Sequence, residues 1–312
     1  MPRTDHRCSP ADTITLAIIA KLEEGVRPWI RPWRSDRSNG RPRRANGEPY
    51  RGINSLWLGH LADALGYGSD IWMTYRQAQE LGGQVRKGER SQIVFFYKSY
   101  PQAKPNAADD EIETRRVLRT YAVFSVDQID GLPQRFAPVS SNAATPFDIL
   151  PEAATLFIDG FPGAIRHGDR AFYHRGQDFI ALPSIDLFQS RAHWAATLMH
   201  EAGHWTGHPS RLDRAFGRRF GDEAYAVEEL CAELCASFLG ADLGLPPQHL
   251  DDHASYIDHW LKVLRMDSRA LFNIAAKAEA AASYLHSLIK ARPRTVFSMP
   301  PSCRGAVAGR RD

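Results

Sequence analysis

Apolar residues recur every three to four positions in several stretches of the chain, a spacing that predicts amphipathic helices. The first stretch begins after Ser9, a good N-terminal cap, and places Ile14, Ile18 and Leu22 on one face. The same spacing predicts six further helices in the order 54–65, 74–81, 152–159, 189–207, 223–243 and 250–264, and a last one over 268–290.

Runs rich in β-branched and aromatic residues predict strands between these helices. Two strands are expected in the first half, at 93–97 and 116–126, with a polar loop over 101–113 between them. Three short strands are expected in the second half, at 164–166, 171–174 and 178–182. The order of elements predicts an α+β fold with an N-terminal α+β domain and a mainly helical C-terminal domain that carries a small sheet.

Composition changes divide the chain into units. Residues 134–150 are rich in Pro, Ser, Asn and Ala, which predicts a linker between a domain at 1–133 and a domain at 151–291. Residues 292–312 predict a disordered tail. No apolar run approaches the roughly 20 residues of a membrane span, and no signal-peptide pattern is present. We therefore expect a cytoplasmic chain without membrane contact, in which the four cysteines (Cys8, Cys231, Cys235 and Cys303) are reduced.

The helix predicted over 189–207 contains the sequence His200-Glu201-Ala202-Gly203-His204. Two histidines four residues apart lie on one face of a helix, so both imidazoles can reach a single Zn²⁺ ion. Glu201 is then placed to take a proton from the metal-bound water. This pattern indicates a metallopeptidase centre with Glu201 as the catalytic base. The strand over 178–183 is expected at a sheet edge, where it could hold a substrate backbone by strand addition.

A catalytic zinc site needs a third protein ligand. Glu229, on the next long predicted helix, is the favoured candidate, and Glu233 one turn later could accept the N–H of a ligating histidine. His208 and Asp213 stay open as alternative third ligands. A metal-dependent nuclease is a weaker interpretation, because nucleases gather acidic residues around hard cations.

Basic residues concentrate in the first half of the chain, where eight arginines against two acidic residues lie between Arg27 and Arg51. Arginines neutralise phosphates, and interleaved aromatic rings stack on unpaired bases. This composition favours a surface for single-stranded DNA, and the residues predicted to form it are Arg27, Trp29, Arg31, Trp33, Arg34, Arg43, Arg44, Tyr50, Arg51, Arg76, Arg86 and Lys87.

Several short motifs make the chain similar to a known family. They are, in the first half, Gly25–Trp29, Pro49–Asn54, Thr74–Ala78, Gly82–Glu89 and Phe124–Ile129, and in the second half, His200–His208, Ser210–Leu212 and Glu228–Leu230. With these motifs the chain resembles the ArdC/TraC-type antirestriction family of conjugative plasmids and mobile elements. The resemblance implies a single-stranded-DNA-binding N-terminal domain, a zincin-like C-terminal domain and protection of incoming DNA from host restriction.

Two functions are therefore expected as alternatives. In the first, a zinc-dependent peptidase is brought by its DNA-binding domain to proteins on entering DNA, such as restriction enzymes. In the second, the chain only coats single-stranded DNA and its metal site is structural or vestigial.

Overall fold

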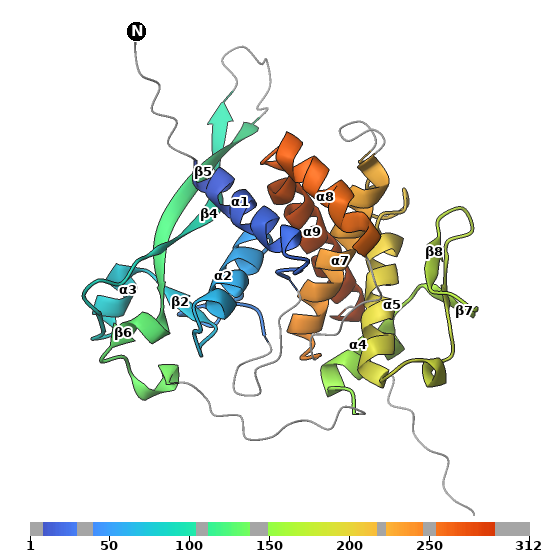
Figure 1. Cartoon of the computed structure of the whole chain (residues 1–312), viewed down its shortest axis with the longest axis horizontal. Coiled ribbons are helices and arrows are strands. Elements are labelled where there is room, and N and C mark those ends of the chain that lie inside the picture. Colours follow the sequence, from blue (N-terminus) through green and yellow to red (C-terminus); the bar gives the residue numbers. More distant parts are fainter. Residues whose placement is uncertain are drawn as a thin grey trace, which may run out of the picture.

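A computed structural model describes residues 9–29, 40–103, 112–137, 149–216, 223–245 and 254–290. Strands flank a central group of helices on two sides. The hairpin of β4 (Gln92–Ala103) and β5 (Ile112–Ser125) lies on one side of the molecule, and β7 (Ala164–His167) and β8 (Phe172–His174) lie on the other (Figure 1). The predicted α+β class and two-part architecture are confirmed. Residues 138–148 of the predicted linker at 134–150 and the predicted tail at 292–312 lie outside the described residues, so the domain boundaries stay a prediction.

The N-terminal half combines short helices with a four-stranded sheet. The helices are α1 (Pro10–Glu23), α2 (Ile53–Ala64) and α3 (Tyr75–Glu80). The sheet has the order β1-β2-β5-β4, from β1 (Arg43–Arg44), β2 (Ile71–Met73), β5 (Ile112–Ser125) and β4 (Gln92–Ala103), and a second, two-stranded sheet pairs β3 (Gln84–Val85) with β6 (Ile129–Asp130). Ser9 caps α1 in a reciprocal capping box with Asp12.

The β4–β5 hairpin is longer than the sequence predicted. The antiparallel pairing runs from Gln92↔Val123 to Ala103↔Ile112, through positions expected to be a loop. The apolar pattern ends near Tyr97, but a ladder of backbone hydrogen bonds needs no apolar side chains to continue. The loop prediction for 101–113 was therefore wrong at both of its ends.

The C-terminal half is mainly helical. It contains α4 (Glu152–Gly160), α5 (Arg191–Thr206), α7 (Ala224–Asp242), α8 (Ala254–Met266) and α9 (Ala270–Lys290). Its sheet has the order β7-β9-β8, from β7 (Ala164–His167), β9 (Phe179–Leu182) and β8 (Phe172–His174). The expectation that β9 is an edge strand was wrong, because β9 pairs with β7 on one side and β8 on the other and all four of its residues are buried.

One hydrophobic core joins the two halves. α1 packs on α8, α2 packs on α9, and the rings of Phe95 and Phe272 meet edge to face at 5.1 Å. Cys231 and Cys235 lie in this core as free thiols, as predicted, and burial raises the pKa of Cys231 to about 12. No helix in the described ranges is long and apolar enough to cross a membrane.

A buried arginine also links the halves. Arg41, which is 5% exposed, donates hydrogen bonds from its guanidinium to Glu279 on α9 at 2.5 Å and to Asp242 on α7 at 2.7 Å. Glu279 also accepts a hydrogen bond from the backbone N–H of Gly52, at the start of α2. The guanidinium lies over the Phe238 ring. Arg41 and Gly52 of the N-terminal half thus bind acidic side chains of α7 and α9 in the C-terminal half.

We expect Arg41→Ala to lower the free energy of unfolding by about 3–5 kcal/mol, because it leaves two carboxylates without their cation in a low-dielectric environment. Arg43→Ala is the matched control: its side chain is 49% exposed beside Asp70, so the expected loss is below about 1 kcal/mol. Urea denaturation measures both. Equal losses in the two variants would contradict the role assigned to Arg41.

Candidate metal centre

Helix α5 directs His200 and His204 toward α7, and Glu201 is buried on the same helix. Ser190 caps the helix by accepting a hydrogen bond from the backbone N–H of His193. At the crossing point, a Cβ on Gly203 would lie 3.2 Å from Cα of Ala232, closer than side chains normally approach. The two helices can pack this closely because both residues are small. The carboxylates of α7 are thereby brought against the imidazoles of α5.

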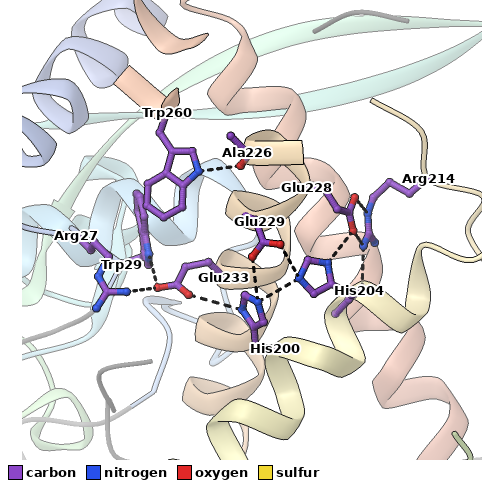
Figure 2. Close-up of polar contacts among 11 residues, drawn as sticks. Arg27, Trp29, His200, His204, Arg214, Ala226, Glu228, Glu229, Glu233 and Trp260 are labelled. Atoms are coloured by element: carbon purple, nitrogen blue, oxygen red, sulfur yellow. Dashed lines mark hydrogen bonds and ion pairs between the residues drawn. The ribbon is translucent and has the colours of Figure 1, made fainter. Parts of the chain in front are cut away.

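His200, His204 and Glu229 converge at one point (Figure 2). The two Nε2 atoms are 3.1 Å apart, and each lies 3.4 Å from one of the carboxylate oxygens of Glu229. Ligands about 2.0–2.1 Å from a tetrahedral zinc ion are separated by about 3.3–3.4 Å. The donor set therefore fits a divalent cation with little rearrangement.

The alternative third ligands lie elsewhere. Helix α5 ends at Thr206, and His208 beyond it is half-buried and hydrogen-bonded through Nδ1 to Ser210 Oγ at 2.7 Å. Asp213 lies in the following loop at a positive φ of 42°. Among the described residues, the group that could hold a metal consists of His200, His204 and Glu229 without either alternative.

The Nδ1 side of the His204 ring contacts a carboxylate, which in turn pairs with an arginine. Its Nδ1 lies 3.3 Å from Glu228 Oε1, and Arg214 Nε donates to the other oxygen of Glu228 at 2.9 Å. Arg214 is 3% exposed and also donates to the Gly203 carbonyl and the Thr206 hydroxyl, both at 2.8 Å. Sequence reasoning missed both partners. Glu228 stood beside the favoured ligand, but no spacing rule pointed to Arg214.

The carboxylates around the two histidines favour the protonated form of His204. Burial lowers the pKa of His204, but hydrogen bonds to Glu228 and Glu229 and the charge of Glu229 and Glu201 outweigh it and raise the pKa to about 10. Burial raises the pKa of Glu229, yet the two histidines lower it well below its ordinary value. A metal cation binding here must displace a proton from His204, which is usual for imidazole ligands.

His200 also has a carboxylate beside its Nδ1 atom, and this carboxylate too pairs with an arginine. Glu233 Oε2 lies 3.7 Å from His200 Nδ1, an ion-pair distance, and the Glu233 side chain is 1% exposed. The second carboxylate oxygen accepts hydrogen bonds from Arg27 Nη1 at 3.0 Å and Trp29 Nε1 at 3.3 Å (Figure 2). Glu233 therefore lies beside His200, and two of its partners come from the other half of the chain.

Tyr225 adds a phenol beside the ligand set that the sequence reasoning did not single out. It lies one turn before Glu229 on α7, and its side chain is 64% exposed. Desolvation of the hydroxyl and hydrogen bonds to Tyr256 and Glu229 raise its pKa. A hydrogen-bond donor is thus present on the solvent side of the centre.

Two of the predicted DNA-stacking residues are in the core. Trp29 is 6% exposed and packs edge to face on Trp260 at 5.6 Å, and Tyr50 is 3% exposed beside Phe96. A buried ring cannot stack on a base, so the stacking role assigned to Trp29 and Tyr50 does not fit this structure. The reason is the large gain from burying aromatic surface.

The cations predicted to bind phosphates differ in their exposure to solvent and in their ion pairs. Arg27 is largely buried against Glu233, whereas Arg51 and Lys87 are exposed. Arg31, Trp33 and Arg34 lie outside the described residues. The remaining cations are exposed or half-buried and pair with local acids: Arg43 with Asp70, Arg44 with Glu48, Arg76 with Glu80, and Arg86 with Glu89 and Asp130.

The fold and the site define the class of protein: two parts, of which the second is a metallopeptidase-like unit with an HExxH helix. Residues 152–277 match the family described as zincin-like metallopeptidase. Residues 9–124 match the family described as the N-terminal domain of anti-restriction factor ArdC.

The chain belongs to the ArdC family of antirestriction proteins. It is 40% identical to the antirestriction protein ArdC of plasmid R388, in a metal-free crystal structure with a TM-score of 0.76 that covers 91% of this chain and 99% of that one. A Mn(II)-bound structure of the same protein has a TM-score of 0.73, with 92% and 99% covered.

Two curated relatives are also similar. The uncharacterized protein y4eC of Sinorhizobium fredii (strain NBRC 101917 / NGR234) is 39% identical over 88% of this chain and 91% of its own length. DNA primase TraC of Escherichia coli is 37% identical over 84% of this chain, which spans 25% of the primase.

We expect Glu229→Gln to lower zinc affinity by more than the roughly 10–100-fold that loss of an outer partner costs, because it removes a charged ligand. His208→Ala and Asp213→Ala should bind zinc like the unmodified chain. Competition with a chromophoric chelator measures all three. Loss of zinc binding in His208→Ala, with Glu229→Gln unaffected, would transfer the third-ligand role to His208.

Proposed function

We propose that this chain is an antirestriction protein that binds single-stranded DNA without sequence specificity and carries a zinc-dependent peptidase centre. In this role it protects incoming DNA of a conjugative plasmid or other mobile element from host restriction in the cytoplasm. The observation that carries the catalytic part is the convergence of His200, His204 and Glu229 around one point, with Glu201 next to the first ligand.

His200, His204 and Glu229 would hold the metal in this proposal. Two imidazoles and one carboxylate suit zinc, although related sites accept other divalent ions. When bound, the cation supplies Lewis acidity, which polarises a scissile carbonyl and acidifies a water molecule. The outer carboxylates Glu228 and Glu233 fix the orientation of the imidazoles.

Glu201 is proposed as the general base. It is 7% exposed and follows His200 directly on α5, and its charge contributes to the raised pKa of His204. It accepts a proton from the attacking water and then delivers it to the leaving amine of a peptide bond. The substrate proposed for this reaction is a protein on the entering DNA, such as a restriction enzyme.

We expect Glu201→Gln to lower peptidase activity on an unfolded protein substrate by about 100-fold or more, because the amide cannot accept the proton. Zinc and DNA binding should be retained. Glu152→Gln, an exposed glutamate in the first turn of α4, is the matched control and should keep full activity.

The same variant separates the two candidate functions. If Glu201→Gln protects DNA from restriction as well as the unmodified chain does, catalysis has no part in protection. The alternative, a non-catalytic protein that coats single-stranded DNA and has a structural or vestigial metal site, would then replace the proposal.

The DNA-binding part is proposed to lie in the N-terminal half. Arg44, Arg51, Arg86 and Lys87 keep cationic groups at the surface there. Tyr121 on β5 is an aromatic ring that is 46% exposed and meets Phe96 edge to face at 5.5 Å. Arg44 lies over the Phe96 ring, so charge and aromatic surface occur together.

We expect the affinity for an oligo-dT strand to fall steeply with salt, because phosphate contacts release counterions. Lys87→Gln should reduce the slope of log K against log salt by about 0.7, the value for one contact on a single strand. Fluorescence polarisation over a salt series measures the slope. A slope near zero in the unmodified chain would exclude a phosphate-dominated interface.

A further inference from the structure

We propose that Arg27 and Trp29 are positioning residues of the metal centre: the N-terminal half holds Glu233 against His200 and so completes the surroundings of the metal. The inference deepens the proposed function and rests on the metal site described there. It gives Arg27 and Trp29 a different role from the DNA contact that their sequence context predicted.

The two oxygens of Glu233 have different tasks. Oε1 accepts hydrogen bonds from Arg27 at 3.0 Å and from the Trp29 indole at 3.3 Å. Oε2 faces Nδ1 of His200 at 3.7 Å. The carboxylate thus bridges the N-terminal half and a metal ligand (Figure 2). A carboxylate placed at Nδ1 favours the tautomer whose Nε2 carries a lone pair for the metal.

Trp29 is itself fixed along α7. Its carbonyl accepts a hydrogen bond from Ser237 Oγ at 2.9 Å, one turn after Glu233. Its ring packs on Trp260, whose indole N–H is anchored on the carbonyl of Ala226 at 2.7 Å. The segment that carries Arg27 and Trp29 is therefore docked on the same helix that supplies the metal ligand Glu229.

The two histidines have equivalent supports. His204 is backed by Glu228 and Arg214, and His200 is backed by Glu233 and Arg27. Arg214 lies within the residues that match the zincin-like family, but Arg27 lies within those that match the ArdC N-terminal domain. The zincin-like unit alone contains one complete carboxylate–arginine pair, and the other pair is formed only with the N-terminal half in place.

Removal of the Arg27 guanidinium would leave the positions of Glu233 and His200 less well fixed. Glu233 is 1% exposed, and a buried carboxylate that loses a cationic partner is strongly destabilised unless it moves toward water or another charge. Such a movement would release His200 from its orientation. Loss of an outer partner of this kind typically weakens metal binding about 10–100-fold.

Two conservative substitutions in the full chain test the inference while the chain still folds. Arg27→Gln deletes the charge, whereas Trp29→Phe keeps a ring against Trp260 and deletes only the N–H donor. We expect zinc affinity, measured by competition with a chromophoric chelator, to fall about 10–100-fold in Arg27→Gln and by a smaller factor in Trp29→Phe. Arg27→Lys should recover part of the loss. Arg43→Gln, an exposed arginine of the same half, is the control and should bind zinc normally.

A second readout separates positioning from general stability. Zinc raises the melting temperature of any chain that binds it in the folded state. A merely structural role would lower the melting temperature equally with zinc and with chelator, whereas a positioning role shrinks the rise that zinc produces. Shrinkage in Arg27→Gln and Trp29→Phe, with an unchanged rise in Arg43→Gln, is the expected result.

The outcomes distinguish the inference from the proposed function. If the unmodified chain binds no zinc, the proposed metal centre fails. If it binds zinc and both variants bind within twofold of it, the centre stands and the inference is overturned. A smaller salt slope for oligo-dT binding in Arg27→Gln, with normal zinc affinity, would also overturn it and return Arg27 to the DNA surface.

Discussion

The close approach of α5 and α7 at Gly203 and Ala232 is the constraint on which the metal centre depends. It sets the carboxylates of Glu229 and Glu233, both buried, and the half-buried carboxylate of Glu228 against the imidazoles of His200 and His204. Such a concentration of negative charge in an apolar interior is costly unless cations balance it. Arg214 and Arg27 supply part of that balance, and a divalent cation at the histidines would supply more.

The same charge balance explains why the two halves share one core. The centre draws one arginine from its own half and one from the N-terminal half, and Arg41 repeats the principle further along α7 with Asp242 and α9 with Glu279. Two halves that meet through buried charges are not independent modules. Metal occupancy and the docking of the N-terminal segment are then expected to stabilise each other, as linkage requires.

Much of this was predictable from local patterns. Helical periodicity located α5 and α7, and the four-residue spacings of His200 with His204 and of Glu229 with Glu233 placed each pair on one helix face. The contact between Arg27 and Glu233 was not predictable, because the two residues are far apart in the chain. In a sequence, an arginine near tryptophans also looks the same whether the segment binds DNA or is buried against another part of the fold. Burial, which a single sequence does not reveal, decides between them.

The most direct test is the anomalous diffraction of crystals of the zinc-loaded full chain at the zinc absorption edge. The account predicts one strong peak about 2.0–2.2 Å from Nε2 of His200, Nε2 of His204 and a carboxylate oxygen of Glu229. A peak held by His208 or Asp213 in place of Glu229, or the absence of any peak at these histidines, would contradict it.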